Sequence, residues 1–386
     1  MFKRILVIKL RNIGDVLLTT PIFRIIKNNF PSCYLAVLIN KETEGVLERN
    51  PFIDKIMTFE RKIKNLSFLQ RYLNELTFIR DIKRKYFDTT IDLTGGDRAS
   101  IISYLSGAKL RIGIKSKGFL GKSFLYSKLF EVDKNKHTVL QHLEVIEKIG
   151  LVIERPRVEI FVSEEEINWA KKFIQNQVMQ IRNVDEPQFL NEKFILVHPT
   201  SRWLFKCWRD DYMAEVIAWM VRNNFNVILT SSPAQGELEK INSIISTLRT
   251  RLLNNSETFM KRIINLSGKL NLRQLIAICS ISHMFFGVDT APMHIAAALD
   301  KPTVAIFGPT GAFNWGPWDN ESEEVSYPKR SGIQKFGKNI VIQRDWSCIP
   351  CGKDGCEGSK ISNCLVDIKP KEVINIISEE IKKIRE

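Results

Sequence analysis

Residues 283–310, HMFFGVDTAPMHIAAALDKPTVAIFGPT, constrain the fold most, because apolar runs alternate there with short polar loops. The pattern predicts a buried strand at Met284–Val288, a capping turn at 289–292, a helix at Met293–Leu299 and a second strand at Thr303–Phe307. In an open α/β sheet, ligands bind beyond the carboxyl ends of the strands, and the free N–H groups of a helix start attract anions. The stretch therefore indicates either a phosphate-binding corner or an ordinary capped βαβ unit.

The same alternation of strand and helix runs through the whole chain. Dense apolar runs predict further strands at Arg4–Leu10, Tyr34–Ile39, Lys55–Phe59, Thr89–Leu93, Leu110–Ile114, Phe194–His198, Asn226–Thr230 and Ile263–Leu266. Helical patterns separate these runs, and 386 residues are enough for two hydrophobic cores. We therefore predict an α/β protein with two doubly wound, Rossmann-like domains.

The domain boundaries are set by a polar stretch, Gln180–Glu192, after which the pattern of strands and helices starts again. We predict an N-terminal domain at residues 1–178 and a C-terminal domain at residues 190–368. Residues 369–386 have the pattern of a charged amphipathic helix, which we expect to pack back on the N-terminal domain. The first ten residues lack the features of a signal peptide, and no uncharged apolar stretch reaches the roughly 18 residues of a membrane span.

The net charge of +14 is concentrated in one region, because residues 61–130 hold 15 Lys and Arg against 5 Asp and Glu. Such a basic face suits nucleic acid, acidic lipid headgroups or a phosphorylated saccharide, and a solubilising surface without a partner is the alternative. Within this region, residues 115–128, KSKGFLGKSFLYSK, mix lysine with glycine and aromatic residues. We interpret the segment as a loop that lies on a membrane surface or grips an acidic acceptor through Lys115, Lys117 and Lys122.

Four of the seven cysteines, Cys348, Cys351, Cys356 and Cys364, are clustered late in the chain. Without a secretion signal, a disulfide framework is not the first interpretation. Four thiols in 17 residues are able to hold zinc, but the second pair is spaced too widely for a standard zinc ribbon. Whether these cysteines hold a metal stays open at this point.

Two more polar loops follow predicted strands. Asp15 lies where the first strand ends, and it either caps its helix or takes part in function. The loop HPTSRWLFKCW provides the hydroxyls of Thr200 and Ser201 and the cation of Lys206 at an edge that it shares with the Asp289 loop. Lysine and helix amides together are able to hold a diphosphate without a metal. P-loop, dinucleotide and Asp-x-Asp motifs are all absent from the sequence.

These loops carry a resemblance. The motifs IKLRNIGDVLLTTP, HPTSRWLFKCW, NLSGKL and FFGVDTAPMHIAAAL, together with PTVAIFGPTGAFNWGPW, are similar to those of the lipopolysaccharide heptosyltransferases of glycosyltransferase family 9, most of all the heptosyltransferase III type. The resemblance implies a GT-B fold, with two Rossmann-like domains facing across a cleft. It also implies inverting transfer of heptose from ADP-L-glycero-β-D-manno-heptose to a lipid A–core oligosaccharide, without a cofactor or an essential metal.

The resemblance also implies roles for individual residues. Asp15 matches the carboxylate of the family's Gly-Asp motif, the general base, and the loop that holds Thr200, Ser201 and Lys206 matches the segment at the donor phosphates. The segment at the diphosphate is matched by Asp289, Thr290 and Ala291, with alanine where many relatives have glycine.

The remaining donor contacts are expected around the nucleoside. Leu270 matches a backbone contact to adenine, and Glu237, with Glu239 as its rival, is our candidate for the ribose hydroxyls. His294 either supports the diphosphate or packs behind it, and His198 is interpreted as structural.

Two alternatives stay open. One is a GT-B transferase that uses another nucleotide sugar or another cell-surface glycan. The other is a nucleic-acid-binding protein with a zinc-bound cysteine cluster, which leaves Asp15, Lys206 and Asp289 without a role. For the transferase we expect a cytoplasmic enzyme, held at the inner face of the inner membrane by electrostatics, with no nucleic-acid partner.

Overall fold

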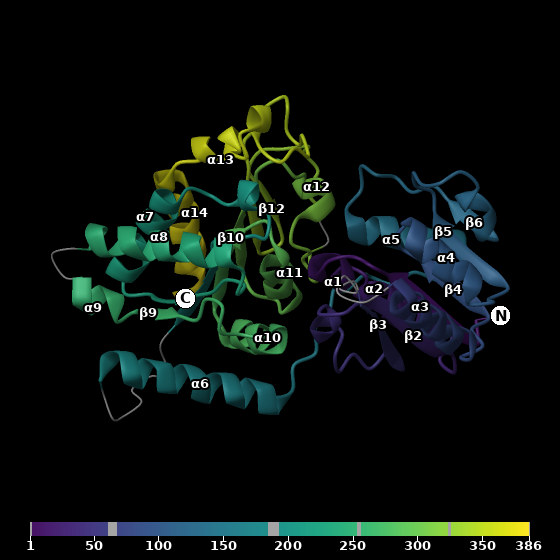
Figure 1. Ribbon diagram of the computed structural model, residues 1–386. Coiled ribbons are helices and arrows are strands. Elements are labelled where there is room, and N and C mark those ends of the chain that lie inside the picture. The colour runs from purple at the N-terminus through teal and green to yellow at the C-terminus, as the bar shows by residue number, and fades with distance from the viewer. Residues whose placement is uncertain (1, 61–67, 184–192, 253–255, 323–325, 386) are drawn as a thin grey trace. The chain divides into compact units, whose positions relative to one another are not determined.

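The computed structural model describes residues 2–60, 68–183, 193–252, 256–322 and 326–385. The chain divides into two compact units, Met1–Phe161 and Val162–Glu386 (Figure 1). Most of the polar stretch that we expected at the domain boundary, Gln180–Glu192, lies outside the described residues.

The first unit is built on a six-stranded parallel sheet with the order β3-β2-β1-β4-β5-β6. Its strands are β1 (Arg4–Lys9), β2 (Tyr34–Asn40), β3 (Lys55–Phe59), β4 (Thr89–Asp92), β5 (Leu110–Ile114) and β6 (Lys128–Phe130). Its helices are α1 (Ile13–Leu17), α2 (Thr20–Asn29), η1 (Glu44–Val46), α3 (Phe68–Lys83), α4 (Asp97–Leu105), η2 (Lys122–Leu125) and α5 (Thr138–Lys148). The strand order reverses between β1 and β4, as in a doubly wound fold.

The second unit has a seven-stranded sheet with the order β12-β13-β11-β10-β7-β8-β9, in which only β12 runs antiparallel to its neighbour. Its strands are β7 (Phe194–His198), β8 (Asn226–Leu229), β9 (Ile263–Asn265), β10 (Met284–Val288), β11 (Thr303–Ile306), β12 (Gln334–Phe336) and β13 (Asn339–Ile342). Its helices are α6 (Glu164–Arg182), η3 (Leu204–Lys206), α7 (Asp210–Arg222), α8 (Gln235–Arg251), α9 (Ser256–Met260), α10 (Leu272–Ile281), α11 (Ala291–Ala298), α12 (Ala312–Trp315), η5 (Cys356–Gly358), α13 (Asn363–Asp367) and α14 (Pro370–Arg385). Here the order reverses between β7 and β10.

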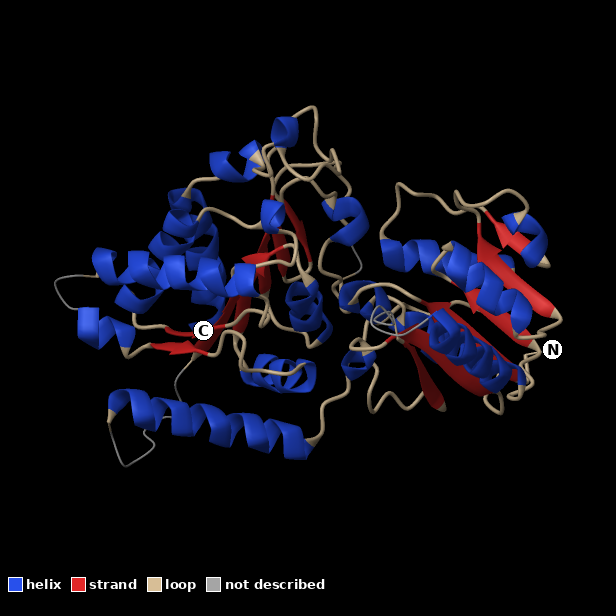
Figure 2. Cartoon of the chain, viewed as in Figure 1, coloured by secondary structure: helices blue, strands red, loops and turns tan. Residues whose placement is uncertain are grey.

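Each sheet carries helices on its faces, which is why its central strands are buried along almost their whole length (Figure 2). In the first unit, α3 and α4 pack on the face formed by Leu6, Ile8 and Leu38. In the second unit, α7, α8 and α14 cover one face, and α11 packs against β10 and β11. The predicted fold class, two doubly wound α/β domains, is confirmed.

The domain boundaries differ from our expectation at two helices. Helix α6, most of which we expected in the first domain, belongs to the second unit and packs alongside α10 (Figure 1). An ion pair of 2.6 Å between Glu166 and Arg273 holds the two helices together. We expected the C-terminal helix to pack back on the first domain, but it packs in the second unit. Val373, Ile377 and Ile381 of α14 are buried in the core of the second unit, against α7.

Candidate active site

The loops that follow β7 and β10 lie at the reversal point of the second sheet, where doubly wound folds bind ligands. Close packing of the two strands depends on Gly287, because a Cβ atom at this position would lie 2.4 Å from the carbonyl oxygen of His198. Register places Gly287 opposite His198, so the two loops leave the sheet side by side. The polar residues predicted from these loops therefore reach one corner.

Lys206 and Asp289 meet at this corner. The Nζ of Lys206 lies 2.8 Å from Oδ2 of Asp289, and the hydroxyl of Thr310 donates to the same oxygen. Both side chains of the ion pair are largely withdrawn from solvent, at 18% and 8% exposure. The ion pair holds one cation at the carboxyl edge of the sheet, beside the start of α11.

Helix α11 begins at Ala291, two residues earlier than we expected. Thr290 occupies the N-cap position in extended conformation, and its side chain makes no capping hydrogen bond. The carboxylate of Asp289 is engaged by Lys206 rather than by helix amides. The backbone thus forms the predicted turn before the helix, but the side chain of Asp289 does not cap the helix and pairs with Lys206 instead.

His294 lies in the same helix and is buried. Burial lowers the pKa of its imidazole to about 4, against the opposing effect of Asp289, so the ring is neutral at neutral pH. Within the described part of the chain, its Nδ1 has no hydrogen-bond partner. A buried imidazole nitrogen without a partner is unusual, and a ligand group is one way to satisfy it.

Glu237 organises the loops that follow β7 and β8. Its carboxylate accepts hydrogen bonds from the hydroxyl of Thr200 at 2.7 Å and from the hydroxyl and backbone N–H of Ser232 at 2.5 and 3.2 Å. The rival candidate Glu239 is exposed and accepts from Gln235 at 2.8 Å. Glu237 is thus the one of the two that is joined to the predicted phosphate loop.

The remaining predicted residues of the second unit lie in neighbouring loops. Ser201 is buried and its backbone N–H donates to the sulfur of Cys207 at 3.2 Å. Leu270 is half-buried in the loop after β9, directly before Asn271, which caps α10. His198 is buried at the end of β7, with Nδ1 2.9 Å from the hydroxyl of Thr230.

In the first unit, Asp15 is half-buried in the first turn of α1, just beyond the carboxyl end of β1. Among the described residues, none makes a hydrogen bond to its carboxylate. The carboxylate is therefore available to an incoming group, as a general base requires.

Sequence reasoning missed a buried basic pair close to this position. The ammonium of Lys9 donates to the carbonyl oxygen of Leu93 at 2.9 Å and lies 2.9 Å from Nε2 of His142. Burial lowers the pKa of Lys9 to about 8, against the opposing charge of Asp15. The signal was a single lysine inside the apolar run RILVIKL, but the sequence does not indicate its partner 133 residues away.

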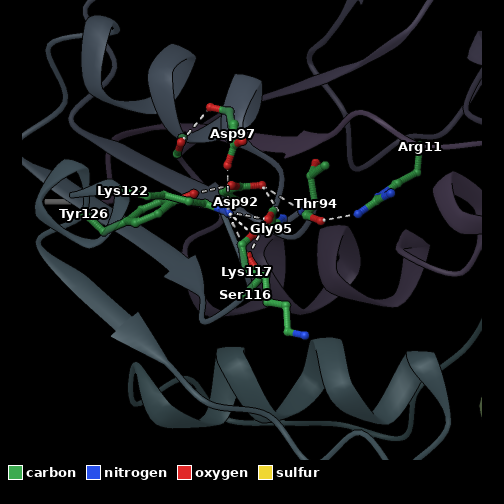
Figure 3. A network of polar contacts seen from close by, with 10 residues as sticks. Arg11, Asp92, Thr94, Gly95, Asp97, Ser116, Lys117, Lys122 and Tyr126 are labelled. Atoms are coloured by element: carbon green, nitrogen blue, oxygen red, sulfur yellow. Dashed lines mark hydrogen bonds and ion pairs between the residues drawn. The ribbon is translucent and has the colours of Figure 1, made fainter. Parts of the chain in front are cut away.

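A second polar network ties the segment after β5 to the loop after β4 (Figure 3). The buried ammonium of Lys122 donates to the carbonyl oxygens of Gly95 at 2.6 Å and Lys117 at 3.2 Å and to the hydroxyl of Ser116 at 2.8 Å. These three bonds use all three N–H groups of the ammonium. Lys122, which we expected to contact an acceptor, is therefore a structural anchor.

The other two lysines of this prediction are exposed. Lys115 forms a solvent-exposed ion pair with Glu131, and the side chain of Lys117 lies on the surface. Both are placed to meet a charged partner from solution.

The four clustered cysteines differ in their exposure. Cys348 and Cys351 are exposed, Cys356 is half-buried and Cys364 is buried. In the described ranges, no group of three or more His, Cys, Asp or Glu is arranged to hold a metal ion.

None of the described helices combines the length and the apolar character that crossing a membrane demands.

Comparison with known proteins agrees with this architecture. Residues 76–343 match the sequence profile of Glycosyltransferase family 9 (heptosyltransferase). The chain is similar to lipopolysaccharide heptosyltransferase 3 of Escherichia coli K12, with 28% identity over 79% of this chain and 82% of that protein. It is also similar to lipopolysaccharide core heptosyltransferase OpsX of Haemophilus influenzae, with 25% identity over 87% of this chain and 88% of that protein.

Solved structures extend the likeness to the whole fold. A family 9 glycosyl transferase from Veillonella parvula superposes with a TM-score of 0.75 at 20% identity, covering 99% of this chain and 98% of that one. The E. coli heptosyltransferase WaaC, solved with ADP, superposes with a TM-score of 0.68 at 18% identity, covering 98% of this chain and 99% of that one. The fold is therefore of the GT-B type.

Proposed function

Since the chain belongs to glycosyltransferase family 9 (heptosyltransferase), we propose that it transfers heptose from ADP-L-glycero-β-D-manno-heptose to the inner core of lipopolysaccharide, with inversion at the anomeric carbon. Membership in the family makes the protein a glycosyltransferase of lipopolysaccharide core biosynthesis. The donor, the stereochemistry and the heptosyltransferase III type of acceptor are the parts that we add.

The donor diphosphate is assigned to the corner of Lys206 and the start of α11. The ammonium of Lys206 neutralises the charge that builds up on the leaving ADP, and helix amides add hydrogen bonds without a change of geometry during the reaction. Thr290 and Ala291 supply the backbone at the helix start, where the alanine limits close approach more than a glycine would. His294, neutral and with an unsatisfied Nδ1, lies behind this position and supports the same assignment.

The adenosine half of the donor is assigned to the loops after β7, β8 and β9. Glu237 is already an acceptor of three hydrogen bonds, so a ribose hydroxyl would replace or share the contact with Thr200 or Ser232. Leu270 would meet adenine through its backbone. Ser201, buried beside Cys207, would support the phosphate loop.

Asp15 is assigned as the general base. Its carboxylate would take the proton from the acceptor hydroxyl while that oxygen forms a bond to the anomeric carbon of heptose. The bond between that carbon and the phosphate oxygen breaks at the same time, and its electron pair leaves with ADP. Attack from the side opposite to the leaving group inverts the anomeric configuration. Every charge in this scheme is handled by Asp15, Lys206 and backbone amides, so we propose a reaction without an essential metal.

The acceptor is assigned to the first unit and its basic surface. The exposed Lys115 and Lys117 would contact phosphate or Kdo carboxylate groups of the lipid A–core oligosaccharide, and Lys122 would hold their segment in place. The protein would act in the cytoplasm, attached to the cytoplasmic face of the inner membrane through these charges.

The single observation that carries the donor proposal is the Lys206–Asp289 pair at the carboxyl edge of the second sheet. Calorimetric titration with ADP, UDP and GDP, without added metal, tests it directly. We expect selective binding of ADP. Preference for UDP or GDP would keep the fold and overturn the heptose donor in favour of a transferase that uses another nucleotide sugar.

A further inference from the structure

The segment between β5 and β6 exposes three large apolar side chains within six residues. Phe119 is 44% exposed, Leu120 is fully exposed at 102% and Phe124 is 85% exposed. Single exposed apolar residues are common on soluble proteins, but a cluster of this kind marks an interaction surface. We call these three residues the apolar tip.

Buried hydrogen bonds hold the segment that carries the apolar tip in place. Lys122, which lies between Leu120 and Phe124 in the sequence, is buried and fixed by the carbonyl oxygens of Gly95 and Lys117 and by the hydroxyl of Ser116 (Figure 3). At the end of the segment, the buried Tyr126 donates to Oδ2 of Asp92 at 2.5 Å. The segment is therefore anchored through its polar groups at two points, while its apolar side chains face solvent.

The charge around the apolar tip is mostly positive, although Asp97 lies 3.5 Å from the ammonium of Lys122 and Glu131 pairs with Lys115. Residues 98–130 contain seven Lys and Arg and no Asp or Glu. Lys115, Lys117 and Lys128 are exposed within or beside the segment. Anionic lipid headgroups attract such lysines with about 1 kcal/mol each, so they act together with apolar side chains at a bilayer surface.

The neighbouring helix also exposes apolar side chains. Helix α4 packs against η2, and its Ile101 and Tyr104 are 43% and 51% exposed. Tyrosine is favoured at membrane interfaces, because its ring is apolar and its hydroxyl stays hydrated. A basic surface with exposed apolar side chains fits an anionic lipid surface.

We propose that the apolar tip inserts Phe119, Leu120 and Phe124 into the headgroup region of an anionic phospholipid bilayer, with Lys115, Lys117 and Lys128 at the level of the lipid phosphates. This inference deepens the proposed function. Only the reason for membrane binding, access to a lipid-linked acceptor, rests on that function. The segment leaves β5 at the carboxyl edge of the first sheet, the edge beyond which Asp15 follows β1. A lipid-linked acceptor would thus lie in the bilayer that contacts the edge of the unit on which Asp15 is found.

Vesicle flotation of the full chain tests the proposal, with vesicles of phosphatidylglycerol and phosphatidylethanolamine that contain no lipopolysaccharide. Attachment by charge alone is released by moderate salt, whereas apolar insertion retains protein on the vesicles. We expect wild-type protein to float at low salt and in part at high salt. The variant Phe119→Ser/Leu120→Ser/Phe124→Ser should lose the salt-resistant fraction, with a partition coefficient lower by about a hundredfold or more.

Two further variants separate the contributions. Lys115→Gln/Lys117→Gln/Lys128→Gln should weaken binding at low salt, by about fivefold for each lysine. Tyr86→Ser/Val152→Ser, which removes two apolar side chains that are 80% and 72% exposed elsewhere in the same unit, should float like the wild type. Equal flotation of the tip variant and the wild type would overturn the proposal, and so would complete release of the wild type by salt.

A direct readout of insertion comes from Leu120→Trp. On vesicles, the added indole emission should shift to shorter wavelength and be quenched by brominated lipid. An unshifted emission would overturn insertion, and self-association of the wild type through the apolar tip without vesicle binding would replace the bilayer by a second copy of the chain. Titration with ADP in the tip variant keeps the two proposals apart: loss of flotation with intact ADP binding concerns the membrane surface alone, and loss of ADP selectivity with intact flotation concerns the donor alone.

Discussion

The Nζ of Lys206 and Oδ2 of Asp289 lie 2.8 Å apart, although 83 residues separate them in the chain. The loop after β7 brings the lysine and the loop after β10 brings the aspartate, because β7 and β10 are neighbours in the sheet. The hydroxyl of Thr310 holds the same carboxylate oxygen. An anionic ligand at this corner has to share the ammonium of Lys206 with Asp289. The ion pair therefore fixes the position in which the ammonium would meet a diphosphate.

Removal of this cation should weaken donor binding. For Lys206→Ala we expect the affinity for ADP to fall by about ten- to a hundredfold, because a charge-assisted hydrogen bond to phosphate is lost. Lys206→Arg should retain part of the affinity. Lys240→Ala, which breaks a separate ion pair with Asp210, serves as the matched control and should bind ADP like the wild type. Calorimetry measures all three, and unchanged ADP affinity in Lys206→Ala would remove this lysine from the site.

The base is tested by separating turnover from binding. Asp15→Asn keeps the size of the side chain but loses the proton acceptor, so we expect turnover to fall by about a hundred- to ten-thousandfold with ADP affinity unchanged. Asp81→Asn, at an exposed position of α3, is the matched control. Turnover of Asp15→Asn within a few-fold of the wild type would contradict the assignment.

The buried Lys9 should make stability depend on alkaline pH. Burial lowers the pKa of Lys9 to about 8, while the unfolded chain keeps the ordinary value of 10.5. Between these two values the unfolded chain binds one more proton than the folded protein, so the free energy of unfolding gains a contribution that rises with pH. Lys9→Met should lose this rise. Urea unfolding across this interval compares the two proteins, and parallel pH profiles would show that Lys9 does not titrate there.

His294 should have its effect in acid. Its pKa is about 4 in the folded protein and 6.5 in the unfolded chain, so its contribution is present above pH 6.5 and is lost as the pH falls toward 4. For a fully buried imidazole this amounts to about 3 kcal/mol. In His294→Gln the loss of stability between these pH values should be smaller than in the wild type. Chemical unfolding at each pH measures the difference, and the same acid dependence in both proteins would refute it.

Gly287 should tolerate no side chain. A Cβ atom there would lie 2.4 Å from the carbonyl oxygen of His198 and 2.8 Å from Cζ of Phe285, so β10 would have to move away from β7. We expect Gly287→Ala to lower the free energy of unfolding by about 1–3 kcal/mol or more. Gly236→Ala is the control, because its Cβ would meet only Leu204 at 3.4 Å and alanine favours the helix by about 0.5–1 kcal/mol. Similar unfolding curves for both variants would contradict this account.

The sequence by itself determined most of the strands, though not β6, β12 or β13, and it indicated the edge of the sheet at which the polar loops gather. RILVIK and MFFGV are mostly apolar because both faces of a central parallel strand are buried, and this property is written locally in the chain. The positions of Asp15, Lys206 and Asp289 in the segments that follow strands came from the same rule, without knowledge of which loops meet.

Only the tertiary structure decided which side chains share a contact. The pairing of Lys9 with His142, the burial of Lys122 against Gly95 and the packing of α6 and α14 in the second unit all join residues that are distant in sequence. The periodicity of apolar residues indicates whether a residue is buried, but it does not indicate which other residues it contacts. A lysine in the sequence reads the same whether its ammonium ends in water or among three acceptors. The strand order and the crossovers bring those acceptors into place, and they are set by the packing of the whole domain.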